Sequence, residues 1–254
     1  MKINQRQSEM YQYIKKNESV KVQDLLLMFQ VSAPTIRKDL AILEDAGMIV
    51  RTHGAARMAS QADPITPFEA RSSLHKEAKE MIARKAVQYI EEGDSIILDS
   101  GTTTLEIARL LTGWSNLNIF TNSIPIAMML SSSRVSVNLV GGILLGRNFS
   151  LQGPDTEEYF HRIEVSKTFI SASGIRLNYG LVNSQSLESS VKKSMISAGK
   201  TVFAVLDSSK FQTPSVYPSG KWAELDYIIT ETPIKDNNIR EQIENSGIKV
   251  LMAE

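Results

Sequence analysis

Cysteine is absent from the 254-residue chain, which excludes a disulfide framework, a thiolate metal site and a cysteine nucleophile. A chain without cysteine suits a reducing compartment. Apolar runs are short, and none approaches the roughly 20 residues that a membrane-spanning helix needs. The first residues, Met1-Lys2-Ile3-Asn4-Gln5-Arg6, also lack the apolar core of a signal peptide. We therefore expect a cytoplasmic protein without a membrane partner.

Motifs for metals and nucleotides are missing as well. The three histidines, His53, His75 and His161, are scattered without ligand spacing, so no metal site is expected. The chain contains neither a Walker A sequence nor a G-x-G-x-x-G run, which argues against a nucleotide cofactor. No G-x-S-x-G elbow supports a hydrolase. We assign no cofactor and no catalytic residue.

Net charge is also lacking, because 28 Lys and Arg balance 28 Asp and Glu. With 42% apolar and 22% charged residues, the composition is typical of a folded globular chain. The balance hides an asymmetry: residues 1–57 carry nine basic and six acidic side chains, and the remainder carries 19 basic and 22 acidic ones. A small cationic excess favours nucleic-acid binding only where the cations share one face.

A break in composition divides the chain near residues 58–72. This stretch is small and polar and contains Pro64 and Pro67, so neither a helix nor a strand continues easily through it. We interpret it as a linker between a domain over 1–57 and a domain over 73–254. An ordinary surface loop is the alternative interpretation.

The first domain has a helical pattern followed by a hairpin. Apolar spacing predicts helices over about 4–16, 23–30 and 33–46, the last ending at Gly47, and two extended runs over 49–58. In the third helix Ile36, Leu40 and Leu43 form one apolar stripe, and Ser32 can cap the N-terminus. At about 100° per residue, Pro34, Lys38 and Ala41 point away from the stripe and Arg37 flanks them.

This third helix suits the major groove of DNA. Its small outer residues allow close approach, and a recognition helix points its N-terminal residues at base edges. Arg37 could bind guanine, while the hairpin would act as a wing on the flanking backbone or minor groove. The alternative is a surface helix whose cations are merely solvated. The predicted DNA-contacting residues are Ser32, Pro34, Thr35, Arg37, Lys38, Arg51, His53 and Arg57.

The same residues carry a family resemblance. Arg6, Met10 and Ile14, followed by Ser32-Ala33-Pro34-Thr35-Ile36-Arg37-Lys38-Asp39-Leu40 and by Arg51-Thr52-His53-Gly54-Ala55, resemble the helix-turn-helix signature of the DeoR family of bacterial transcriptional regulators. The resemblance implies a winged helix-turn-helix that binds operator double-stranded DNA. The family usually has a second glycine where this chain has Ala55, and a positive φ there would strain an alanine.

The second domain alternates strands and helices. Short, β-rich apolar runs occur at 96–98, 118–121, 135–140, 167–171, 201–206, 226–230 and 248–252. Helical patterns lie at about 73–92, 102–112, 123–131, 156–162, 187–199 and 236–246. This alternation predicts an α/β fold with a mostly parallel sheet, since parallel neighbours need crossover helices.

Polar residues gather at the ends of these strands, where open parallel sheets bind ligands. A glycine, three threonines and a following helix would hold an anion such as phosphate, and Lys210 or Lys192 could neutralise it. A phosphorylated sugar or polyol fits better than a nucleotide; simple helix capping is the alternative. The predicted effector-binding residues are Asp99, Ser100, Gly101, Thr102, Thr103, Thr104, Thr121, Asn122, Gly141, Gly142, Lys192, Asp207 and Lys210.

The resemblance to the DeoR family continues through this half of the chain. The motifs around Asp99, Gly141, Gly174, Glu188 and Asp207 look like the family's sensor domain, which resembles ribose-5-phosphate isomerase and related CoA-transferase folds. The resemblance implies a sugar-phosphate effector near residues 99–104, Lys192 and Lys210.

We therefore predict a transcriptional repressor of a sugar or polyol utilisation operon, acting as a homo-oligomer and not as an enzyme. The rival hypothesis is a sugar-phosphate isomerase with an appended nucleic-acid-binding domain. In that case Asp99, Glu188 or Asp207 would supply the base and Lys210 would stabilise an enediolate. A protein-interaction role for the first domain is a third possibility, which the cations of the third helix argue against.

Overall fold

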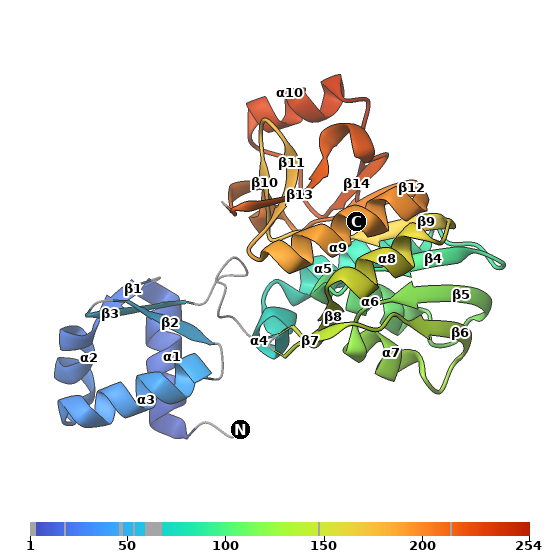
Figure 1. Cartoon of the computed structure of the whole chain (residues 1–254). Coiled ribbons are helices and arrows are strands. Elements are labelled where there is room, and N and C mark those ends of the chain that lie inside the picture. The colour runs from blue at the N-terminus through green and yellow to red at the C-terminus, as the bar shows by residue number, and fades with distance from the viewer. Residues whose placement is uncertain are drawn as a thin grey trace. The chain divides into compact units, whose positions relative to one another are not determined.

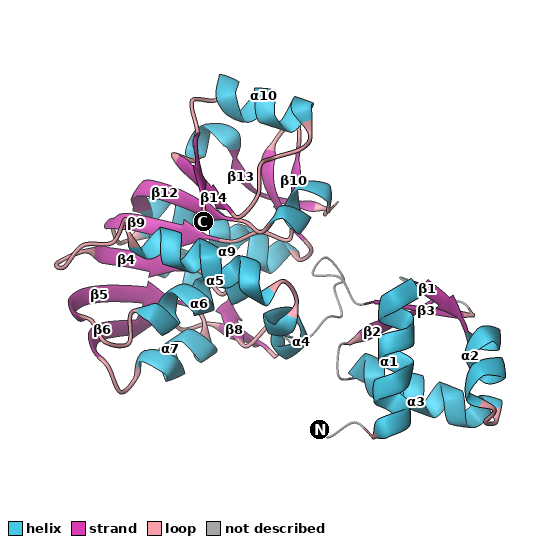
Figure 2. Cartoon of the chain, turned by 180° about the vertical axis from the view of Figure 1, so that it is seen from behind, coloured by secondary structure: helices cyan, strands magenta, loops and turns pink. Residues whose placement is uncertain are grey.

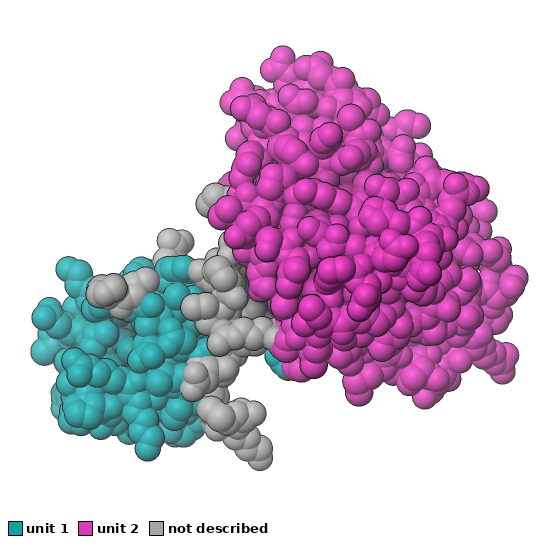
Figure 3. Space-filling model, viewed as in Figure 1, with its two compact units in different colours: residues 1–74 teal, residues 75–254 magenta. Residues whose placement is uncertain are grey.

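The chain divides into two compact units, Met1–Leu74 and His75–Glu254, shown in different colours in Figure 3. A computed structural model describes residues 4–17, 19–45, 48–52, 54–58, 68–146, 148–213 and 215–254. Each unit is built around its own apolar core. We call them the first unit and the second unit.

Within residues 4–58 of the first unit, three described helices pack against a small antiparallel sheet (Figure 1). The sheet has the strand order β1-β3-β2, and β2 and β3 form the wing. Its core consists of Met10, Ile14, Val20, Leu25, Ile36, Leu40, Leu43, Ile49 and Ala56. The elements are α1 (Gln5–Asn17), β1 (Ser19–Lys21), α2 (Val22–Phe29), α3 (Ala33–Asp45), β2 (Ile49–Thr52) and β3 (Ala55–Met58).

These elements confirm the helices and the hairpin that the sequence pattern predicts. The predicted stripe of α3 is fully buried, with Ile36, Leu40 and Leu43 exposed by at most 1%. The predicted helix end at Gly47 lies outside the described residues. A further short helix, α4 (Phe68–Ser73), overlaps the last residues of the stretch 58–72 that we interpret as a linker.

The second unit is built on a seven-stranded parallel sheet with the strand order β15-β14-β12-β9-β4-β5-β6. This confirms the predicted parallel α/β fold. From β4 the chain adds β5 and β6 on one side, and it then returns to β9 and adds strands on the other. The strands are β4 (Ser95–Leu98), β5 (Ser115–Thr121), β6 (Arg134–Leu139), β9 (Val165–Ile170), β12 (Gly199–Val205), β14 (Tyr227–Thr230) and β15 (Lys249–Met252).

Five described helices of the second unit form two groups of neighbours, α5 (Lys76–Val87) with α6 (Thr102–Leu110) and α7 (Ile124–Leu130), and α8 (Pro154–His161) with α9 (Ser186–Ala198), seen with the sheet in Figure 2. A further helix, α10 (Asn237–Asn245), precedes the last strand. The helix predicted over 73–92 is shorter than expected. None of the described helices is long and apolar enough to cross a membrane.

Two smaller sheets were not predicted. A hairpin joins β7 (Ile143–Leu145) to β8 (Ser150–Gln152). An antiparallel sheet combines β10 (Gly174–Arg176), β11 (Gly180–Asn183) and β13 (Tyr217–Lys221). Two 3-10 helices, η1 (Ser208–Gln212) and η2 (Trp222–Glu224), complete the unit.

Candidate functional site

The outer face of α3 is open to solvent. Pro34, Arg37 and Lys38 are exposed, and Thr35 is half-buried. The Ser32 hydroxyl accepts a hydrogen bond from the backbone N–H of Thr35 at 3.4 Å and lies 2.8 Å from the Thr35 hydroxyl. Ser32 therefore caps the helix as predicted, and the two hydroxyls stand at its first turn.

A groove separates α3 from the wing. It has a volume of about 380 Å³ and is lined by Val22, Arg37, Leu40, Glu44, Arg51, Gly54 and Ala55. Glu44 accepts hydrogen bonds from Arg51 Nε at 2.6 Å and from the Arg51 backbone N–H at 3.0 Å. Arg37 forms no hydrogen bond or ion pair with the residues that the structure describes. Of these two predicted DNA contacts, Arg51 is thus already paired and Arg37 is available to a ligand.

The wing resolves the question raised by Ala55. The positive φ of the turn, +80°, belongs to Gly54, and Ala55 begins β3. An alanine is therefore unstrained at this position. Arg57, also on β3, donates a hydrogen bond to the Met58 carbonyl at 3.0 Å. The predicted contact His53 lies outside the described residues.

Asp39 joins α3 to α1 from a buried position that the sequence analysis did not single out. It is 2% exposed and accepts hydrogen bonds from Arg6 Nε at 2.6 Å and Gln7 Nε2 at 2.8 Å. Burial alone raises the pKa of Asp39, but the bonds from Arg6 and Gln7 and the charges of Arg6 and Lys38 lower it below its ordinary value. The sequence feature that could have indicated this network is an acidic residue next to the apolar positions of α3.

In the second unit, β4 and β9 mark the place where the strand order reverses, which is where ligands bind in open α/β sheets. Asp99 follows β4 and Ser171 follows β9. Asp99 Oδ2 accepts hydrogen bonds from the backbone N–H of Ser171 at 2.9 Å and from its hydroxyl at 2.5 Å. The two central strand ends are therefore tied together at their carboxyl edge.

Lys192, on α9, contacts both of these strand ends from a buried position. Its ammonium group donates to Asp99 Oδ2 and, at 3.0 Å, to the Ser171 carbonyl; Glu188 lies 3.7 Å away. Lys192 and Asp99 are each 1% exposed. One of the two lysines predicted to neutralise a phosphate thus already has a buried counterion.

The hydroxyl groups of residues 99–104 are of two kinds, those that bind within the protein and those that could bind a ligand. The Thr104 hydroxyl lies 2.5 Å from the Asp99 carbonyl and 2.8 Å from the Gly101 carbonyl, to which it donates, so this hydroxyl is bound within the turn itself. Ser100, Thr102 and Thr103 donate no side-chain hydrogen bond to the residues that the structure describes. These three hydroxyls, at the start of α6, are the ones that a ligand could use.

The ends of β5 and β6 meet the β7–β8 hairpin. Asn122 donates to the Leu151 carbonyl at 2.8 Å, and its Oδ1 atom is buried with no partner among the described residues. The Thr121 hydroxyl accepts from the backbone N–H of Ser123 at 3.1 Å. The Gly141 carbonyl accepts from Thr156 at 2.7 Å, and a Cβ at Gly142 would lie 2.6 Å from the Gln152 carbonyl. Asn122 is the member of this group that retains an acceptor for a ligand.

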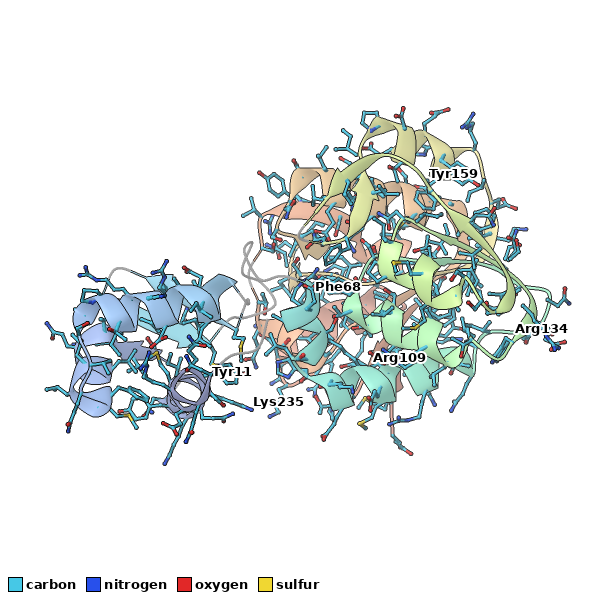
Figure 4. All side chains as sticks on the ribbon, turned by 90° about the horizontal axis from the view of Figure 1, so that it is seen from below. Tyr11, Phe68, Arg109, Arg134, Tyr159 and Lys235 are labelled. Atoms are coloured by element: carbon cyan, nitrogen blue, oxygen red, sulfur yellow. The ribbon has the colours of Figure 1, made fainter. Side chains whose placement is uncertain are left out.

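A cavity of about 280 Å³ opens beside the end of β12. Asp207, which is 1% exposed, caps η1 by accepting from Ser209 through Oδ1, and its Oδ2 atom has no partner among the described residues. The predicted Lys210 is 7% exposed. Lys235, labelled in Figure 4, is exposed. The cavity is lined by His75, Ser208, Ser209, Phe211, Gln212, Thr232, Pro233, Ile234, Lys235 and Asp236.

Sequence reasoning missed the residues that line this cavity from other segments, such as His75, Thr232 and Lys235, because they reach the same edge from α5 and from the loop after β14. Within the described ranges, no group of three or more His, Asp or Glu side chains could hold a metal ion. The carboxyl edge of the large sheet can therefore offer hydroxyls and buried acceptor oxygens to a small polar ligand, and the exposed Lys235 lines the cavity beside β12.

A winged helix-turn-helix unit followed by a parallel α/β unit is the architecture that the comparisons with known families also find. Residues 6–62 match the DeoR-like helix-turn-helix domain, and residues 74–232 match the DeoR C terminal sensor domain. The chain belongs to the DeoR family of transcriptional regulators.

Curated relatives match over most of the chain. The HTH-type transcriptional regulator IolR of Bacillus subtilis (strain 168) is 33% identical over 90% of this chain and 91% of its own length. The glycerol-3-phosphate regulon repressor of Escherichia coli (strain K12) is 30% identical over 92% of each chain. Ribose 5-phosphate isomerase A from Methanocaldococcus jannaschii is a structural neighbour with 16% identity and a TM-score of 0.38 over 54% of each chain.

Proposed function

We propose that this chain is a repressor of a sugar or polyol utilisation operon, and that a phosphorylated sugar or polyol changes its affinity for operator DNA. The observation that carries the proposal is the outer face of α3, where Arg37 is exposed without a partner among the described residues and the residues around it are small. The relatives named as a regulator and as a glycerol-3-phosphate regulon repressor support the same conclusion.

On the DNA side, α3 lies in the major groove. Arg37 donates to guanine, the commonest specific contact of an arginine, while Ser32, Thr35 and Lys38 bind phosphates or bases. The wing residues Arg51, His53 and Arg57 contact the flanking backbone. One such unit covers few base pairs, so the protein acts as a symmetric homo-oligomer on paired half-sites.

On the effector side, the ligand binds the carboxyl edge of the large sheet. Its hydroxyls donate to Asn122 Oδ1 or to Asp207 Oδ2, buried acceptors without a partner among the described residues, and its phosphate accepts from the hydroxyls at the start of α6. Lys210, in η1 beside the end of β12, supplies a cation. The ligand changes DNA affinity only by binding two states of the protein unequally.

Substitution of Arg37 tests the DNA side. A duplex selected by the wild-type chain from random sequences provides the probe. Arg37→Ala should bind this duplex about 5- to 150-fold more weakly, because one bidentate base contact is worth about 1–3 kcal/mol. Lys16→Ala, which removes an exposed cation from the end of α1, is the matched control. An Arg37→Ala variant that binds and footprints like the wild type would remove α3 from the interface.

Calorimetry with sugar phosphates tests the effector side. Titration of phosphorylated pentoses, hexoses and polyols should give saturable binding, the unphosphorylated compounds should bind far more weakly, and no compound should be turned over. Lys210→Ala and Thr103→Ala should weaken binding and leave DNA affinity intact. Turnover of a bound sugar phosphate would instead support the isomerase hypothesis, and unaltered binding by both variants would move the site elsewhere.

A further inference from the structure

A groove between α1 and α3 borders the proposed DNA interface of the first unit. It has a volume of about 460 Å³ and is lined by Asn4, Arg6, Gln7, Pro34, Thr35, Lys38, Asp39 and Ile42. Pro34, Thr35 and Lys38 belong to the face of α3 that we place in the major groove. The start of α1 therefore stands beside the DNA-facing side of α3, and Figure 1 shows the two helices together.

Arg6 is held in this groove by a buried network. Its Nε atom donates to Asp39, whose other oxygen accepts from Gln7. Gln7 is itself fixed by two reciprocal 2.9 Å hydrogen bonds with Asn4 at the start of α1. The Arg6 side chain remains 39% exposed, and its two terminal amino groups donate no hydrogen bond to a described residue. The guanidinium is thus oriented from one side and open on the other.

The positions of the residues around α3 indicate which part of the DNA the open side of the Arg6 guanidinium would face. At about 100° per residue, Thr35, Lys38 and Ile42 lie on one flank of α3, and Arg37, Leu40 and Glu44 lie on the opposite flank. A helix in the major groove has a sugar–phosphate strand on each side. The flank of Arg37 faces the wing, and the flank of Lys38 faces Arg6.

We propose that Arg6 binds a phosphate of the DNA strand that lies on the α1 side of α3, with Asp39 as the residue that positions it. The proposal rests on the proposed binding of α3 in the major groove. A guanidinium has five N–H donors in a fixed fork. Asp39 uses the one on Nε, and the terminal pair remains for a phosphate, which arginine binds with two parallel hydrogen bonds. Arg6 and Lys38 together would fix the helix on this strand as the wing does on the other.

The salt dependence of DNA binding tests the proposal, because each phosphate contact contributes about 0.9 to the slope of log K against log salt. The probe is a mixed-sequence duplex of about 30 base pairs, roughly three helical turns. Arg6→Gln, which retains a donor for Asp39, should reduce the slope by about 0.9. Lys16→Gln, an exposed cation in the last turn of the same helix, should leave the slope unchanged.

A purely structural role for Arg6 predicts a different result. The Arg6→Gln variant would then melt at a lower temperature yet keep the wild-type slope when measured well below that temperature, and this outcome would overturn the proposal. An equal fall in slope for Lys16→Gln would overturn it as well, because the effect would then be one of net charge alone.

Chemical protection of the wild-type chain gives a second test that needs no substitution. Phenylglyoxal modifies accessible arginines, and peptide mass spectrometry reports each one. Duplex DNA should protect both Arg6 and Arg37 and should leave Arg109, an exposed arginine of the second unit, as reactive as before. Protection of Arg37 without protection of Arg6 refutes this inference alone. Protection of neither refutes the proposed DNA-binding face itself.

Discussion

At the scale of single residues, the second unit depends on an ion pair between segments that are far apart in the sequence. Asp99 and Lys192 are separated by 93 positions, and both are buried where the strand order of the sheet reverses. Taking two charges out of water is costly, and only close contact and further hydrogen bonds offset that cost. The bonds from Ser171 to Asp99 and from Lys192 to the Ser171 carbonyl supply them.

Removal of one partner should therefore be strongly destabilising. Lys192→Met keeps the side-chain volume but leaves Asp99 as an unpaired buried carboxylate, which typically costs about 3–5 kcal/mol. Lys193→Met changes the neighbouring exposed lysine and should alter stability by less than about 0.5 kcal/mol. Urea unfolding gives both values. Equal losses for the two variants would show that the ion pair does not hold this edge of the sheet together.

Asp39 makes the first unit sensitive to acid. Its pKa is lowered in the folded chain, so the folded state binds this proton less readily than the unfolded state. The stabilisation is present in full above the unfolded pKa of about 4 and is lost as the pH falls through the lowered pKa. Asp39→Asn should thus destabilise the first unit near neutral pH, and the difference from the wild type should shrink below about pH 4.

Circular dichroism melts across this pH range measure the effect. Asp24→Asn, an exposed acid on α2, is the matched control and should follow the wild type at every pH. A constant difference between Asp39→Asn and the wild type from pH 7 to pH 3 would contradict the assigned role of the Asp39 carboxylate.

At the scale of elements, the turn from β4 into α6 works only with a small residue at its centre. A Cβ on Gly101 would lie 2.7 Å from Ser171 Cβ, so a side chain there would push the ends of β4 and β9 apart. Gly101→Ala should cost about 1–3 kcal/mol, as is usual for overpacking. Gly113→Ala meets nothing within 4 Å and should be nearly neutral. Tryptophan-monitored unfolding compares them, and similar stabilities would refute the close approach.

The elements that sequence periodicity predicted are those with local patterns. The apolar stripe of α3 and the seven apolar strands of the large sheet can each be recognised from a short stretch of sequence. The β7–β8 hairpin and the β10–β11–β13 sheet did not, because their strands are short and β13 joins its partner from over 30 positions away. The Asp39 network and the Asp99–Lys192 pair were not predicted either, because their members are far apart in the sequence and meet only in the folded chain.

The candidate site residues also divide into those that a local sequence pattern predicts and those that depend on tertiary packing. Arg37 and Ser32 were predictable because the helix period alone sets which residues face outward. Lys192 was predicted, with Lys210, as a cation that could neutralise a phosphate, yet tertiary packing gives it a buried counterion. The cavity beside η1 was invisible in the sequence, since His75 and Lys235 come to it from separate segments.

At the scale of the whole molecule, the two units have separate cores, and both tryptophans, Trp114 and Trp222, belong to the second unit. Tryptophan fluorescence therefore reports the second unit, whereas far-UV circular dichroism reports both. A bound sugar phosphate should raise the melting temperature seen by fluorescence, because a ligand stabilises the unit that binds it. A sugar phosphate that binds without moving this transition would contradict the assignment of the effector to the second unit.

The central claim is that the outer face of α3 lies in the major groove, and the lack of native cysteine allows a direct measurement. Pro34→Cys, carrying a tethered iron chelate that cleaves nearby DNA, should cut the selected duplex within a few base pairs of the protected site. Lys16→Cys, about 15 Å further along α1 than Arg6, should cut weakly or elsewhere. Cleavage by Pro34→Cys that is no stronger or more localised than cleavage by Lys16→Cys would contradict the account.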